Sequence, residues 1–110
     1  ELATATAYGA KLIAIVVDNG SYGTIRMHQE REYPGRVSGS DLFNPDFVAL
    51  ALAYGWRAAR IERTEDFEAA FAQAMVPGAP MLIHLKLDAD VSTSRSTLGA
   101  IREAAKKAGR

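Results

Sequence analysis

Hydrophobic positions fall in two patterns along this chain, short unbroken runs and stripes at helical spacing. The longest run, LIAIVV at residues 12–17, has no polar position and is rich in β-branched residues, which is typical of a central parallel strand covered on both faces. This run predicts a strand at residues 12–17, and two mostly apolar segments predict strands at about 56–61 and at 81–87. The helical stripes predict helices near residues 1–8, 45–54, 65–75 and 94–107.

Capping and breaking residues mark the predicted helix ends. Asn44-Pro45 predicts a helix start, because asparagine can accept from free backbone N–H groups and proline loses no hydrogen bond there. Thr64 is predicted to cap the next helix. Gly9 and Gly55 are expected to end helices in a left-handed conformation.

The alternation of helices and strands predicts an α/β fold. Parallel strands joined by right-handed crossovers place helices on both faces, which gives a doubly wound, three-layer arrangement. The three predicted strands make a thin sheet, so we expect further strands to come from outside this chain.

Composition narrows the classes of partner. The 13 basic and 13 acidic residues give a net charge of zero, so no overall field favours nucleic acid or an anionic membrane. No apolar run approaches the roughly 20 residues of a membrane span, and we expect no membrane partner. The absence of cysteine fits a reducing compartment, and the cytoplasm is the expected location.

The stretch DNGSYG follows the first predicted strand directly. In open parallel sheets ligands bind beyond the carboxyl ends of the strands, where Asp18 and Asn19 lie. The Asn19 side chain and a carbonyl in the Gly20-Ser21 turn are oxygen donors of the kind that Mg²⁺ prefers. Glycines 20 and 23 would let a phosphate approach the backbone. From the spacing alone an ordinary strand-to-helix turn is the simpler interpretation, because Asp-Asn-Gly is common in such turns and too short to be specific.

A family resemblance covers nearly the whole chain. The segment ELATATAYGAKLIAIVVDNGSYGTIRMHQEREYPGR is similar to the distal half of the cofactor motif of thiamine diphosphate-dependent enzymes of the acetolactate synthase and benzoylformate decarboxylase group. The similarity continues through NPDFVALALAYGW and PGAPMLIHLKLD. It implies that residues 1–110 are the distal part of a thiamine diphosphate-binding domain, with the Gly-Asp-Gly part of the motif upstream of Glu1 and the other domains elsewhere.

The resemblance assigns roles to the turn. Asn19 matches the second residue of the family's Asn-Asn pair, a side-chain ligand of Mg²⁺, and Ser21 matches the residue whose main-chain carbonyl is the next ligand. Tyr22 and Gly23, with Gly20, match the turn that covers the diphosphate. Asp18 replaces the first asparagine of the pair, is expected among the cofactor-binding residues by its position, and would add a negative charge near the diphosphate.

The next residues match the family's substrate channel. Ile25 stands where decarboxylases of the pyruvate type carry a catalytic glutamate, so the resemblance favours the synthase-like branch and implies no catalytic residue in this chain. Thr24 and His28 replace the methionine and tryptophan of the synthases, which suggests a different substrate. The alternative for His28 is a solvated surface histidine.

Other residues have simpler interpretations. His84 alternates with apolar neighbours and is interpreted as a core or edge histidine. Several charges are interpreted as solvated surface and lack the interleaved aromatics that would suggest nucleic-acid binding. These charges are Arg31, Glu32, Arg36, Lys106 and Lys107.

The resemblance implies a parent enzyme that uses thiamine diphosphate and Mg²⁺ on a 2-oxo acid. It would act by decarboxylation or carboligation, as a lyase or transferase, and as a homo-oligomer, a dimer or a tetramer. We expect the chain by itself to be inactive and to self-associate. One rival is a non-catalytic α/β module that has lost the cofactor. A second, a nucleotide-binding fold, would need a G-x-G-x-x-G turn, which is absent.

Overall fold

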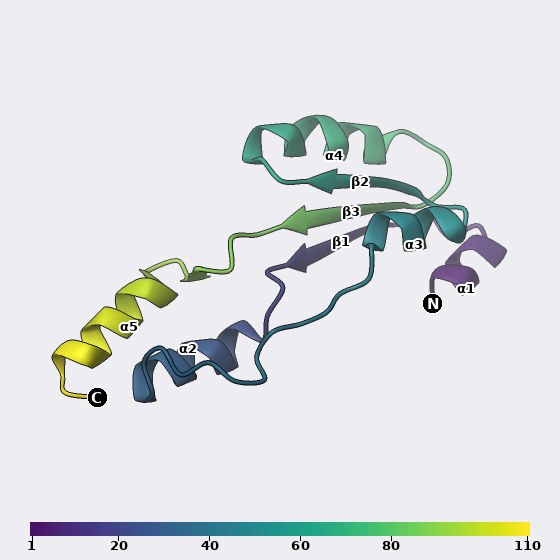
Figure 1. Cartoon of the computed structure of the whole chain (residues 1–110). Helices are drawn as coiled ribbons and strands as arrows, with labels where there is room; N and C mark the ends of the chain where they lie inside the picture. Colours follow the sequence, from purple (N-terminus) through teal and green to yellow (C-terminus); the bar gives the residue numbers. More distant parts are fainter. The chain divides into compact units, whose positions relative to one another are not determined.

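A computed structural model describes all of residues 1–110, which form two compact units (Figure 1). Unit 1 comprises residues 1–18 and 44–86, and unit 2 comprises residues 19–43 and 87–110. The helices are α1 (Leu2–Ala7), α2 (Gly23–Glu32), α3 (Phe47–Ala53), α4 (Phe67–Met75) and α5 (Leu98–Lys107), with a 3₁₀ turn at Thr64–Asp66. The strands are β1 (Ile13–Asp18), β2 (Arg57–Ile61), β3 (Met81–Lys86), β4 (Val91–Thr93) and β5 (Ser96–Thr97).

Unit 1 contains a parallel sheet with the strand order β1-β3-β2. Ile13 of β1 and Arg57 of β2 both pair with Met81 of β3, and both ladders are parallel. The predicted α/β class and strand direction are therefore confirmed. The prediction that residues 12–17 form a central covered strand is wrong for this chain, because β3 is central and β1 leaves Ile15 and Val17 44% and 62% exposed.

Helices cover both faces of this sheet, as the doubly wound, three-layer prediction requires (Figure 1). Ala70 and Ala74 of α4 pack on one face against Ile83. On the other face α1 and α3 pack with Trp56 and Leu82. The two clusters explain the three consecutive apolar residues at the start of β3, since Met81 and Ile83 enter one core and Leu82 enters the other.

Two predicted helix caps are wrong. The N-cap of α3 is Asp46, whose side chain accepts from the Ala49 N–H at 3.0 Å, because the Asn44 amide instead donates to Asp18. Thr64 lies in the 3₁₀ turn and makes no capping hydrogen bond, so α4 begins at Phe67. The left-handed conformations expected at Gly9 and Gly55 are confirmed, with φ of 62° and 80°.

In unit 2, α2 packs against α5, and the hairpin β4–β5 precedes α5. The sequence did not predict this hairpin, because its polar residues show no alternation. The helix expected from residue 94 therefore begins at Leu98, after Thr97, whose hydroxyl accepts from the Ala100 N–H at 3.1 Å. None of the helices in either unit has the length and hydrophobicity that a membrane span requires.

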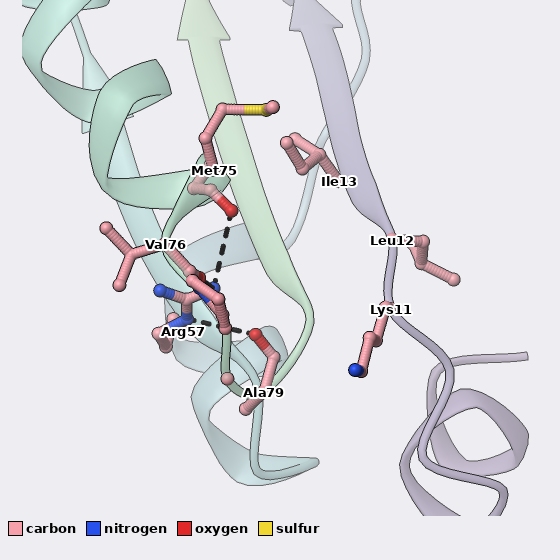
Figure 2. A pocket seen from close by; sticks show the side chains of 10 residues that line it. Lys11, Leu12, Ile13, Arg57, Met75, Val76 and Ala79 are labelled. Atoms are coloured by element: carbon pink, nitrogen blue, oxygen red, sulfur yellow. Dashed lines mark hydrogen bonds between the residues drawn. The ribbon is translucent and has the colours of Figure 1, made fainter.

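A cavity of about 450 Å³ lies at the amino end of the sheet in unit 1 (Figure 2). Lys11 and Leu12 line one side, and the segment after α4 lines the other. The Arg57 guanidinium donates to the carbonyls of Gln73, Val76 and Ala79 at 2.9–3.0 Å, so it caps the end of α4. This cavity is at the edge opposite the carboxyl ends of the strands, and its arginine is already engaged with backbone.

Candidate functional site

The carboxylate of Asp18 at the end of β1 is 5% exposed and is bound by three side chains of unit 1. The Asn44 amide donates to Oδ1 at 2.8 Å, and Lys86 Nζ donates to Oδ2 at 3.1 Å. His84 Nε2 lies 2.9 Å from the same Oδ2. The charge that replaces the family's asparagine is therefore balanced within unit 1, and the geometry indicates a structural role for Asp18.

The apolar neighbours of His84 predicted a core or edge position, and the structure confirms that the residue is buried, with 4% of its surface exposed. Its ring meets the Phe47 ring edge-on, with centroids 5.1 Å apart. The second ring nitrogen, Nδ1, is buried without a hydrogen-bond partner. The ring therefore contributes one polar contact, with Asp18, and otherwise packs in the core.

Residues 19–23 form the strand-end turn. The Asn19 side-chain oxygen accepts from the Ser21 N–H at 3.0 Å, and Gly20 takes φ of 67°. Residues 40–42, the return segment, hold this turn through two backbone bonds. Tyr22 N–H donates to the Ser40 carbonyl at 2.8 Å, and Leu42 N–H donates to the Gly20 carbonyl at 2.9 Å. None of these bonds uses the Ser21 carbonyl, which was predicted as a metal ligand.

Helix α2 begins at Gly23, the last residue of this turn, and has no side-chain cap at its amino end. Its first turn contains no acidic residue that would repel an anion. The N–H groups and partial positive charge at such an end favour a phosphate. A Cβ at Gly23 would stand 2.8 Å from Asn19 Nδ2, so the turn needs glycine there to leave the Asn19 amide in place.

The predicted substrate-channel residues share one face of α2. Thr24, Ile25 and His28 are all exposed. Arg26 and Glu30 lie on the other side of the helix and are shielded from solvent. The structure thus brings the three candidates together on an exposed surface that starts at the strand-end turn.

Glu30 is the most deeply buried charge of unit 2, with no exposed surface. Arg102 of α5 donates to both of its oxygens, at 2.8 Å and 2.5 Å, and the Gly35 N–H donates at 2.9 Å. Arg26 Nε lies 3.6 Å away. The Arg102 hydrogen bonds hold the pKa of the Glu30 carboxyl at about 2, well below its ordinary 4.5.

We expect this depressed pKa to make unit 2 sensitive to acid. Because the folded-state pKa lies below the unfolded value, the Glu30 contribution is complete above pH 4.5 and is lost as the pH falls towards 2. Urea unfolding at a series of pH values should show a gap in the free energy of unfolding between wild type and Glu30→Gln that shrinks across this window. Glu32→Gln, on an exposed acid of the same helix, is the control. A gap independent of pH would contradict the assignment.

The metal donors in this chain are few. No group of three or more His, Asp or Glu side chains is arranged to hold a metal ion. The strand-end turn offers the Asn19 side-chain oxygen and the Ser21 carbonyl, both hard oxygen donors suited to Mg²⁺. These donors and the uncapped start of α2 fit a magnesium-bound diphosphate, provided that further ligands come from elsewhere.

Sequence reasoning missed two charged groups near the turn. Glu30 and Arg102 are separated by 72 residues in sequence, and nothing local marks them as partners. The spacing of Arg26 and Glu30, one helical turn apart, was the available signal. Asp18 and His84 were noticed singly, but their pairing was not.

Comparison with known proteins matches residues 1–85 to the family model "Thiamine pyrophosphate enzyme, C-terminal TPP binding domain". The acetolactate synthase large subunit of Parasynechococcus marenigrum is 36% identical over 85 residues, covering 76% of this chain and 14% of that protein. The acetolactate synthase isozyme 2 large subunit of Escherichia coli is 33% identical over 89 residues, covering 80% of this chain and 16% of that protein.

The mitochondrial acetolactate synthase catalytic subunit of Saccharomyces cerevisiae is 28% identical over 91 residues, covering 83% of this chain and 13% of that protein. The chain thus spans about one seventh of the length of these curated relatives. The matched residues include all of the sheet of unit 1 except its last position, the strand-end turn and α2. This chain belongs to the C-terminal thiamine pyrophosphate-binding domain family and resembles the acetolactate synthases within it.

Proposed function

We propose that this chain anchors the diphosphate and magnesium of thiamine diphosphate in a longer enzyme, the parent protein, which decarboxylates a 2-oxo acid or joins it to an acceptor. The strand-end turn is the observation that carries the proposal. It combines the Asn19 oxygen with the uncapped start of α2 at the carboxyl end of a parallel strand. The acetolactate synthase relatives support the synthase-like reading of the reaction.

The turn residues would divide the binding between metal and diphosphate. Asn19 would bind Mg²⁺ through its side-chain oxygen and Ser21 through its carbonyl. The first N–H groups of α2, from Gly23 onward, would bind the diphosphate, and Gly20 and Tyr22, whose N–H is already bonded to Ser40, would cover it. Bound thiamine diphosphate supplies the electron sink that 2-oxo acid chemistry needs.

The exposed face of α2 would contact the substrate. Thr24 and His28 present a hydroxyl and an imidazole beside the aliphatic Ile25. No acid lies at position 25, so this chain supplies shape and polarity to the substrate site, and proton transfer is left to the cofactor and to other residues of the parent protein. The polar pair favours a 2-oxo acid or acceptor with hydrogen-bonding groups.

We propose that residues 1–110 are the distal part of the cofactor domain. The resemblance puts a further carboxylate ligand and the cofactor-activating glutamate elsewhere in the parent protein. We therefore expect the chain alone to be inactive and to bind the cofactor weakly. The exposed apolar side chains of β1, Ile15 and Val17, support self-association of the chain and a homo-oligomeric parent.

The rival interpretation, a module that has lost the cofactor, was motivated by the negative charge of Asp18. That motivation is weakened because Lys86, His84 and Asn44 already bind the Asp18 carboxylate. We therefore retain cofactor binding as the proposed function.

A test is the release of CO₂ from a panel of 2-oxo acids by the parent protein with thiamine diphosphate and Mg²⁺. We expect turnover of at least one acid. This turnover should be lost when either thiamine diphosphate or Mg²⁺ is left out, and it should also be lost in the Asn19→Ala variant. A parent protein that neither binds thiamine diphosphate nor turns over any acid would be the non-catalytic module.

We expect Gly23→Ala to weaken cofactor binding without unfolding the chain. The added Cβ would meet Asn19 Nδ2 at 2.8 Å and displace a flexible side-chain end, so the cost falls on the metal ligand. Calorimetry with thiamine diphosphate and Mg²⁺ should show affinity at least about tenfold lower. Gly99→Ala in the first turn of α5 is the matched control, since its Cβ would meet only ordinary contacts, with Asp90 at 3.5 Å. Equal affinities of the two variants would count against the Asn19 assignment.

A further inference from the structure

The strand-end turn depends on the return segment for its position. Two backbone hydrogen bonds join them, one from Tyr22 to Ser40 and one from Leu42 to Gly20. These two bonds make the isolated antiparallel bridge between Ser21 and Asp41. A shift of residues 40–42 would therefore move the turn that carries Asn19.

Helix α2 fixes the return segment through its shielded side. Arg26 Nη1 donates to Asp41 Oδ1 at 3.1 Å and to Ser40 Oγ at 3.4 Å. Ser40 is completely buried, and its hydroxyl donates to Gln29 Oε1 at 3.0 Å. Arg26 and Gln29 of α2 thus both contribute to the position of the return segment.

Arg26 is shared between two carboxylates. Its Nη1 contacts Asp41, while its Nε lies 3.6 Å from Glu30. Arg102 of α5 supplies the two close bonds to Glu30, and so satisfies most of that buried charge. Without Arg102, Glu30 would be left with Arg26 as its counter-charge, and a buried carboxylate would draw that guanidinium away from Asp41.

We propose that Arg102 and Glu30 are positioning residues for the strand-end turn. Helix α5 leaves Arg26 free to hold Ser40 and Asp41, and these hold the turn in the geometry that binds metal and diphosphate. The link from α5 to the turn lies entirely within unit 2. Arg102 binds Glu30, Glu30 therefore leaves Arg26 available, and Arg26 binds the return segment. Its effect on cofactor affinity rests on the proposed function, whereas its effect on the turn does not.

The chain provides a matched pair of variants to test this link. Arg102→Met keeps most of the aliphatic stem and removes the charge. Arg110→Met removes another arginine contact from the α5 side to α2, the pair with Glu32, in which both side chains are about half exposed. Arg102→Lys keeps the positive charge but cannot donate two parallel hydrogen bonds to Glu30 as the guanidinium does. It is an intermediate variant, which we expect to fold even if Arg102→Met does not.

Hydrogen exchange of the parent protein without cofactor gives the first readout. In Arg102→Met we expect exchange about tenfold faster in peptides covering residues 19–23 and 40–42, with β3 unchanged, and a smaller increase in Arg102→Lys. Calorimetry with thiamine diphosphate and Mg²⁺ gives the second, with affinity about tenfold lower in Arg102→Met and unchanged in Arg110→Met.

The outcomes separate this inference from the proposed function. If wild type does not bind thiamine diphosphate, the proposed function fails, and the exchange data still decide whether α5 positions the turn. If wild type binds but Arg102→Met matches Arg110→Met in both readouts, the positioning role is overturned. The positioning role would also be overturned if exchange became faster evenly over the whole chain. The same holds if Arg102→Met does not fold and Arg102→Lys matches wild type in both readouts.

Discussion

Replacement of Asn19 by alanine is expected to weaken thiamine diphosphate binding by the parent protein at least about 100-fold in the presence of Mg²⁺. The substitution removes the one side-chain metal donor that the strand-end turn offers. It also removes the acceptor of the Ser21 N–H bond, so the turn loses a hydrogen bond that shapes it. Calorimetric titration with cofactor at saturating Mg²⁺ measures the effect.

Ser21→Ala is the control for this prediction. Its backbone carbonyl, the proposed ligand, is retained, and the hydroxyl that it loses is buried without a hydrogen-bond partner. We expect affinity within about threefold of wild type, since removal of an unpaired buried hydroxyl costs little. Comparable losses in the two variants would exclude the proposed division between side-chain and backbone ligands.

The second large effect is expected at Asp18, on stability. Asp18→Ala leaves Lys86 and His84 of unit 1 without their shared carboxylate. The Lys86 ammonium is partly exposed and keeps much of its hydration, so the cost arises mainly from the His84 ring nitrogen and the Asn44 amide, which lose their partner. An unsatisfied buried polar group costs about 1–3 kcal/mol, so chemical denaturation should show a loss of about 2–3 kcal/mol in the free energy of unfolding. Asp46→Ala calibrates the measurement, because loss of an N-cap in the same unit costs about 1 kcal/mol.

Asp18→Asn restores the residue of the family pattern and separates charge from shape. Asparagine keeps an oxygen for the Asn44 amide, but its amide nitrogen is a donor only and can accept from neither Lys86 nor His84. We expect a loss of stability smaller than that of Asp18→Ala, with cofactor affinity little changed. Markedly tighter cofactor binding by Asp18→Asn would mean that the Asp18 charge does reach the diphosphate.

The sheet was predictable because its strands carry their signal locally. Residues 81–83 are apolar on both faces of the strand, and the parallel direction follows from the alternation with helices. The position of β1 at the edge of the sheet was not predictable. An apolar run indicates that a strand can be covered on both faces, but it does not identify the neighbouring segments that cover it. Asn44 failed as a cap for a related reason, since the tertiary bond to Asp18 overrides a local preference.

Only the part of the candidate site that is continuous in sequence was predictable. Asn19 to Gly23 form one short motif, and the shared face of Thr24, Ile25 and His28 follows from helical spacing. The groups that hold this motif in place come from distant parts of the chain. His84 lies 66 residues from Asp18, and Arg102 lies 72 residues from Glu30, so their pairing depends on the fold as a whole.

The most direct measurement is calorimetric titration of the wild-type parent protein with thiamine diphosphate, in Mg²⁺ and again in EDTA. We expect saturable binding with a micromolar Kd in Mg²⁺ and its loss in EDTA, because the turn would bind the diphosphate through the metal as well as through backbone N–H groups. No binding at saturating Mg²⁺, or equal binding in EDTA, would contradict the proposal that residues 19–23 anchor a magnesium-bound diphosphate.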